Sequence, residues 1–136
     1  MSILTASDLP TSRPGGATRL FEGERYGFTP LSLFLTDVPT GGGASLHTHP
    51  YAEVFIVQEG SARFTLGAET TDVAAGRIVI VPPGVVHGFV SLGPERLRQI
   101  SVHPSPKVLQ TWLDQDETAT AQATQAARRE YSRSKE

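Results

Sequence analysis

Short runs with hydrophobic residues at alternate positions dominate the chain from residue 31 onward. The first run places leucines at positions 31, 33 and 35 and stops at Pro39, shortly before three consecutive glycines. Side chains two residues apart point to the same side of a strand, so this run predicts a strand. Turns that contain glycine or proline separate five further runs, at residues 54–57, 62–66, 78–81, 85–90 and 97–102. Many short strands at this spacing predict an all-β sandwich or barrel.

The segments on either side have a different pattern. Residues 1–30 are rich in Thr, Ser, Gly and Pro, which predicts an N-terminal arm with one or two edge strands around Leu20 and residues 26–28. Residues 114–136 contain one large apolar residue, Tyr131, which predicts a polar, solvated C-terminal tail. The barrel with its packing elements is therefore expected at residues 31–113.

The end of the barrel segment has a helical pattern. Val108, Leu109, Trp112 and Leu113 fall on one helical face. This predicts a short C-terminal helix over residues 106–113 that packs on the barrel, with Trp112 in the core.

The composition narrows the classes of protein. A chain of 136 residues with 38% hydrophobic and 19% charged residues is typical of one globular domain. The net charge of −2 and the absence of a basic run argue against a nucleic-acid partner or an anionic membrane surface. No apolar run approaches the ~20 residues of a membrane helix, and the first residues lack a signal-peptide pattern, so we expect a soluble, cytoplasmic protein. Cysteine is absent, which leaves His, Asp and Glu as candidate metal ligands.

Three of the four histidines lie next to the ends of predicted strands. His47 and His49 point to the same side of their strand, roughly 6.6 Å apart along the chain. Glu53 begins the next predicted strand, and His87 comes from a separate hairpin. Three imidazoles and one carboxylate form a ligand set for a divalent transition metal such as Fe, Mn, Ni, Zn or Co, and they leave up to two octahedral positions for water or substrate. Open positions of this kind indicate a functional metal.

The spacing of these residues forms two motifs. The first, G-x5-H-x-H-x3-E-x6-G, extends from Gly41 to Gly60, and the second, G-x5-P-x-G-x2-H, extends from Gly76 to His87. They resemble the two motifs of the cupin superfamily, and the resemblance to small single-domain cupins extends over about residues 30–113. It implies a double-stranded β-helix of the jelly-roll type. The metal would be held by the residues at the matching positions: His47, His49, Glu53 and His87. The second motif usually ends in Asn, where this chain has Ser91.

The same alternation predicts residues around a cavity beside the metal. Gln99 and His103 share one strand face, so Gln99 is expected in the cavity wall and His103 near its rim. Tyr51, Phe55 and Phe89 are expected to flank the metal as an apolar wall, with plain core packing as the alternative.

Two functions fit these features. The first is a metalloenzyme of the dioxygenase, isomerase or lyase type that acts on a small oxygen-rich organic substrate, in which Glu53 binds the metal and also relays a proton. The second is a non-catalytic small-molecule binding or sensing module with a structural metal. Because small cupins commonly pair and one small barrel leaves apolar surface uncovered, we expect a homodimer.

Overall fold

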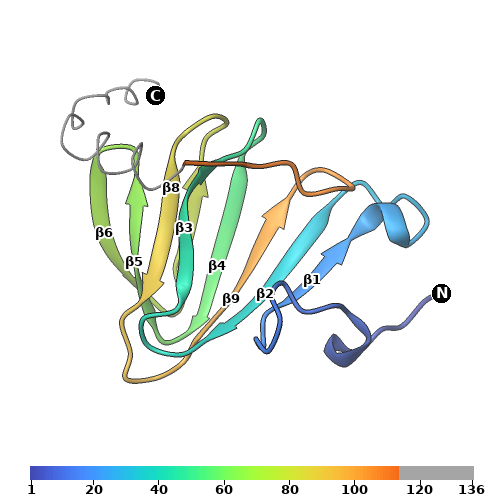
Figure 1. The fold of residues 1–136 in the computed structure, drawn as a ribbon, viewed down its shortest axis with the longest axis horizontal. Helices are drawn as coiled ribbons and strands as arrows, with labels where there is room; N and C mark the ends of the chain where they lie inside the picture. Colours follow the sequence, from blue (N-terminus) through green and yellow to red (C-terminus); the bar gives the residue numbers. More distant parts are fainter. Residues whose placement is uncertain (114–136) are drawn as a thin grey trace.

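Two antiparallel five-stranded sheets pack against each other in the computed structural model, which describes residues 1–113 (Figure 1). One sheet has the strand order β1-β2-β9-β4-β7 and the other β10-β3-β8-β5-β6. This arrangement confirms the predicted all-β double-stranded β-helix. The strands are β1 Arg19–Glu22, β2 Ser32–Val38, β3 Gly43–Thr48, β4 Glu53–Glu59, β5 Ser61–Leu66, β6 Glu69–Ala74, β7 Ile78–Val81, β8 His87–Ser91, β9 Leu97–His103 and β10 Thr111–Trp112; two short 3-10 helices, η1 Ala6–Asp8 and η2 Gly23–Arg25, precede β2.

The topology brings the two motif segments to the same end of the molecule. The β3–β4 and β7–β8 connections both cross from one sheet to the other. The Gly84 amide in the second connection donates to the carbonyl of His49 in the first, at 2.9 Å. Gly84 has a φ of 78°, a left-handed conformation that glycine adopts without a steric penalty. The β7–β8 turn is therefore fastened to the loop that carries one of the candidate metal ligands.

The core changes from apolar to polar along the strands. On β9 the inward positions begin with Leu97, which is fully buried, and end with His103, which is 1% exposed. On β4 the inward positions run in the opposite direction, from buried Glu53 to Phe55 and Val57. The period-2 alternation therefore fills one end of the interior with hydrocarbon and collects polar groups at the other end.

Each of the six predicted strand runs contributes to a strand, whereas β6 was not predicted. Only Val73 is buried in β6, so this strand lacks the hydrophobic alternation that marks the others. In the N-terminal arm, the strand expected around Leu20 is confirmed as β1. Residues 26–28 form a turn, in which Phe28 has a φ of 53° and is 74% exposed.

The prediction of a C-terminal helix over residues 106–113 is wrong. This segment is extended and crosses the end of the molecule from β9 to the edge of the other sheet, where β10 pairs with β3 (brown trace in Figure 1). Backbone pairing explains the difference, because β3 would otherwise be an unpaired edge strand, and the Leu113 amide donates to the carbonyl of Leu46 at 3.2 Å. Trp112 is 49% exposed, so its prediction as a core residue is also wrong.

The predicted polar tail, residues 114–136, lies outside the described residues. Within the described part of the chain, no helix has the length and hydrophobicity that a membrane span requires.

Candidate metal centre

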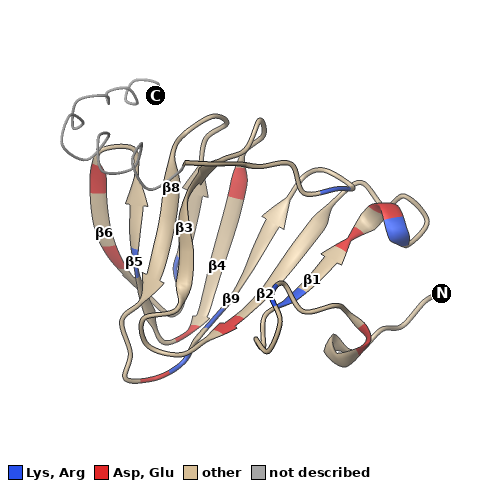
Figure 2. Cartoon of the chain, viewed as in Figure 1, with Lys and Arg blue, Asp and Glu red and all other residues tan. Residues whose placement is uncertain are grey.

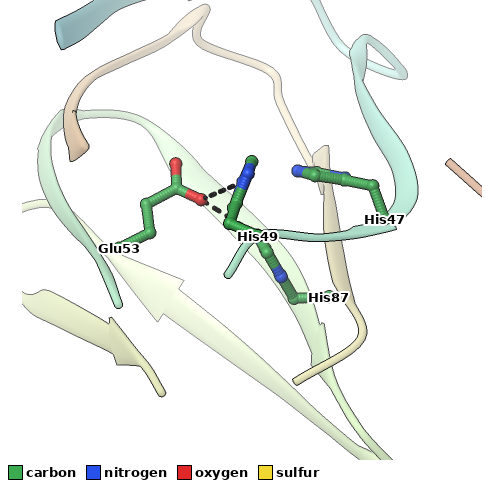
Figure 3. Close-up of side chains that lie close together, drawn as sticks. All are labelled: His47, His49, Glu53 and His87. Atoms are coloured by element: carbon green, nitrogen blue, oxygen red, sulfur yellow. Dashed lines mark hydrogen bonds and ion pairs between the residues drawn. The ribbon is translucent and has the colours of Figure 1, made fainter. Parts of the chain in front are cut away.

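The four predicted ligand residues lie together at the polar end of the interior (Figure 3). His47 lies near the end of β3, His49 just follows that strand, Glu53 begins β4 and His87 begins β8. Each offers one nitrogen or oxygen atom, and these atoms lie within 4.8 Å of one another. All four side chains are buried, with at most 5% exposure. Because the residues come from both sheets, the group forms only when the sheets pack.

The backbone sets the orientation of the three imidazoles. Their Nδ1 atoms lie 2.6 to 2.9 Å from backbone carbonyl oxygens, which can only accept a hydrogen bond. Nδ1 therefore carries the proton, and Nε2 carries the lone pair that a metal ion requires. The pairs are His47 with Ser45, His49 with Leu109 and His87 with Val85.

The lone pairs converge with the carboxylate of Glu53. Its Oε1 atom lies 2.9 Å from Nε2 of both His49 and His87 (dashed lines in Figure 3). The His49 Nε2 atom is buried. Despite the short distance to Oε1, this contact lacks hydrogen-bond geometry, and Nε2 has no hydrogen-bond partner among the described residues. Several acceptor atoms that face one another in a buried site require a positive charge between them. The donor set and its orientation fit a divalent transition metal, which this group could hold.

The titration behaviour of two residues matches what metal ligands need. Burial and the neighbouring imidazole of His87 lower the pKa of His47 to about 3, so this imidazole is neutral near pH 7. Burial alone raises the pKa of Glu53, but the imidazoles around it, His103 first among them, outweigh burial and hold this pKa well below its ordinary range. A neutral imidazole and an ionised carboxylate are the forms that coordinate metal ions.

Acid is expected to destabilise the metal-free protein. His47 takes up a proton near pH 6.5 when unfolded but only near pH 3 when folded, so the unfolded state binds more protons across this interval and stability falls as the pH falls. Glu53 acts in the same direction below its unfolded pKa of 4.5. One such proton changes the free energy of unfolding by at most about 1.4 kcal/mol per pH unit. Urea titrations of chelator-treated protein measure this slope, and a free energy that is constant from pH 6.5 to 4 would contradict the assignment.

The remaining predicted pocket residues occupy different positions. Phe55, Phe89 and His103 line the same cavity as two of the candidate ligands, His47 and Glu53. Gln99 is 1% exposed and points inward, and it is not among the residues that line the cavity, so its place in the wall stays a prediction. Tyr51 is also not among the lining residues, and its hydroxyl oxygen lies 2.8 Å from His103 Nδ1.

The structure adds site residues that the sequence pattern did not predict. The Trp112 ring lies over the imidazole of His47, with ring centroids 4.6 Å apart. Leu109 contributes its carbonyl to His49 and its amide to Tyr51. Strand parity could have predicted Ser101, which lies two residues before His103 in the cavity lining. No side-chain pattern indicates the contribution of Leu109, because only its backbone takes part.

A cavity of about 760 Å³ opens between the two sheets and reaches the metal-binding group. Aromatic side chains from both sheets and from the closing segment form much of its wall, and a few neutral polar groups interrupt them. The aromatic residues are Phe34, Phe55, Phe89 and Trp112, and the neutral polar residues include Thr36, Ser101 and Gln110. Such a lining favours an apolar organic ligand with a few polar atoms.

The arginines of the cavity lie at its other end. Arg96 donates to Asp37 Oδ1 at 2.7 Å, and Asp37 lies five residues along β2 from the position paired with His103, or about 17 Å. Arg13 belongs to the N-terminal arm, which contacts the same end through a bond from the Asp37 amide to Thr18 Oγ1 at 3.0 Å. Figure 2 shows the charged residues of β2 and β9 at this end of the strands. Among the described residues that line the cavity, those at the metal-binding end therefore include no lysine or arginine.

The fold and the site together define a β-sandwich protein with a buried three-histidine, one-glutamate group that could hold a metal. Residues 34–103 match the family described as the cupin domain. The chain belongs to this family. An uncharacterised protein of Streptomyces coelicolor is 39% identical over 77 residues, which cover 57% of this chain and 72% of that protein.

Solved structures support the same fold. Bacillus subtilis oxalate decarboxylase, a protein with Mn(II) centres, has 23% identity and a TM-score of 0.69 over 77% of this chain. That alignment covers 30% of the decarboxylase, so this chain spans less than a third of its length. An uncharacterised Klebsiella pneumoniae protein with a double-stranded β-helix domain has 22% identity and a TM-score of 0.66, over 85% of this chain and 99% of its own.

Proposed function

We propose that the chain is a metal-dependent enzyme of the dioxygenase, isomerase or lyase type that acts on a small oxygen-bearing organic substrate. The observation that carries this proposal is the cavity of about 760 Å³ that reaches the buried histidine–glutamate group. A purely structural metal is normally enclosed by its ligands, whereas a catalytic metal keeps a position open to a cavity. His47, His49, Glu53 and His87 would hold the metal, which supplies Lewis-acid or dioxygen-activating chemistry when bound.

The chain's own residues would bind the substrate and exclude water. Phe55 and Phe89 contribute apolar wall close to His87, with ring centroids of Phe55 and His87 6.2 Å apart. Ser101 and Thr36 can hydrogen-bond substrate oxygen atoms further along the cavity. Glu53 is the candidate proton carrier, because its Oε2 atom faces His103 rather than the candidate ligand imidazoles.

The similar solved structures support a divalent metal and do not identify the substrate. Manganese is the metal named for the oxalate decarboxylase, and it belongs to the group expected from the ligand set. A dicarboxylate such as oxalate gains most from cationic side chains beside the metal. Because both cavity arginines lie at the other end, we propose an apolar substrate with few charges.

Cobalt-substituted protein tests the open metal position. We expect small bidentate oxygen ligands to change the visible absorption of bound Co(II). A 1,3-diketone with a phenyl substituent should bind more tightly than the same diketone with methyl groups alone, because the phenyl group is buried against aromatic side chains. Dioxygen uptake of the iron-loaded protein with diketones, catechols and flavonols then separates oxygenases from isomerases and lyases. An absorption spectrum unchanged by every such ligand would instead favour a non-catalytic module with a structural metal.

We also propose that two copies of the chain pair through the outer face of one sheet. Six β-branched aliphatic residues are joined in cross-strand pairs on this face, and none of them carries a charge. They include Ile78 and Ile80, which are 62% and 65% exposed. An uncharged apolar surface can meet its own copy across a two-fold axis without electrostatic repulsion. The residues are Val54 and Ile56 on β4, Ile78 and Ile80 on β7, and Ile100 and Val102 on β9.

The substitution Ile80→Glu is expected to convert the dimer into a monomer. Each dimer would place two copies of the new carboxylate in the apolar contact, where an unpaired charge is costly. Light scattering at tens of micromolar protein measures the mass. Thr70→Glu, at an exposed position of β6 in the other sheet, is the control and should leave the dimer intact. A wild-type protein of monomeric mass would rule out this interface.

A further inference from the structure

We infer that His103 is a positioning residue for Glu53, and that Tyr51 together with the backbone of Leu109 sets its tautomer. In this arrangement Nε2 of His103 faces Oε2 of the carboxylate, and Oε1 faces the candidate ligand imidazoles. The inference rests on the proposed metal site and concerns side chains that surround it. It assigns a role to the fourth histidine, which the two sequence motifs do not include.

The chain of hydrogen bonds begins at the closing segment, residues 104–113. The Leu109 amide donates to the Tyr51 hydroxyl oxygen at 3.1 Å. An amide N–H can only donate, so the phenol oxygen is the acceptor in this bond and its single O–H remains available. Nδ1 of His103 lies 2.8 Å from the same oxygen. The Tyr51 hydroxyl therefore donates to Nδ1.

This bond gives His103 the opposite tautomer from the other histidines. Nδ1 of each candidate ligand histidine faces a carbonyl oxygen, which places the proton on Nδ1. Nδ1 of His103 faces a donor, which places the proton on Nε2. Nε2 of His103 lies 3.0 Å from Glu53 Oε2, which is within ion-pair distance, although the angle of this contact falls outside hydrogen-bond geometry in the described residues. A protonated nitrogen there is suited to hold a carboxylate oxygen and unsuited to bind a metal.

The surroundings hold the imidazole in this position. His103 is 1% exposed, and its ring packs edge-on against both His49 and Tyr51, with centroids 4.7 Å and 5.4 Å away. The closing segment is itself anchored, because the Val108 amide donates to Glu22 Oε2 at 3.0 Å. Leu109 thus orients His49 through its carbonyl and His103 through Tyr51. One backbone unit supports both sides of the candidate metal centre.

Two variants and one spectroscopic measurement test the inference. Nitrogen-15 NMR of zinc-loaded wild-type protein should report His103 with its proton on Nε2, and Tyr51→Phe should shift the tautomer toward Nδ1, because the donor is lost. His103→Leu should lower cobalt affinity by about 10- to 100-fold in chelator competition and change the Co(II) absorption. His103→Gln, which retains an N–H donor, should recover most of that affinity.

The outcomes separate this inference from the function proposed above. If wild-type protein binds no Co(II), the metal site itself is wrong and the inference falls with it. If wild-type protein binds Co(II) but His103→Leu has the same affinity and absorption, only the role of His103 is overturned. An NMR spectrum with the His103 proton on Nδ1, or a metal-bound Nε2, would overturn it in the same way. Far-ultraviolet circular dichroism of both variants verifies folding, and Tyr51→Phe keeps the test valid if His103→Leu does not fold.

Discussion

Alanine in place of His87 or His49 is expected to lower the metal affinity by more than about 100-fold. Loss of a partner that only orients a ligand already reduces affinity by about 10- to 100-fold, and these substitutions remove the proposed ligand atom itself. Each also leaves Oε1 of Glu53 without one of its two imidazole neighbours at 2.9 Å. Elemental analysis of protein purified without added metal, followed by competition with a chelator, measures the change.

Gln58→Ala is a suitable control for these variants. Gln58 lies on β4 like Glu53 but points outward and is exposed, so this variant should retain one metal per chain. If the His49 and His87 variants keep the full metal content, the site has been assigned to the wrong residues. Full metal content in only one of them would remove that histidine from the ligand set and keep the other.

The second large effect is expected from Phe64→Ala, which should lower the free energy of unfolding by about 3 to 5 kcal/mol. Phe64 is fully buried, and its ring packs against Phe55 and Phe89 with centroids 5.0 and 5.5 Å away. The substitution removes apolar contacts and leaves a cavity that the two β-sheets fill poorly, because their backbones are tied by hydrogen bonds. Urea denaturation measures the loss as a lower midpoint at an unchanged slope.

A neighbouring position provides the control for Phe64→Ala. Arg63 precedes Phe64 on β5, points outward and pairs with Asp72 in solvent, so Arg63→Ala should leave the midpoint nearly unchanged. Because Phe55 and Phe89 line the cavity, Phe64→Ala should also weaken binding of the phenyl-substituted diketone. A loss of stability below about 1 kcal/mol would mean that the core around Phe64 is less tightly packed than the contacts indicate.

The strand pattern and the candidate metal ligands could be predicted from the sequence because both are encoded locally. Alternate residues of a strand face opposite sides, so the leucines of β2 and the inward positions of β9 reveal their strands without tertiary information. His47, His49 and Glu53 lie within seven residues, and His87 has its own motif. β6 could not be predicted in this way, since its residues are mostly polar and exposed.

Only the tertiary structure decided the path of residues 106–113 and the surroundings of the metal centre. The helical spacing of Val108, Leu109 and Trp112 is real, but pairing with β3 and contacts to the N-terminal arm require an extended chain. Sequence alone does not indicate that Leu109 lies beside His49, which is 60 residues away, or that Tyr51 meets His103 across 52 residues. The contacts of Leu109 use its backbone N–H and C=O groups. Every residue except proline carries both groups, so the side-chain pattern of the sequence cannot predict these contacts.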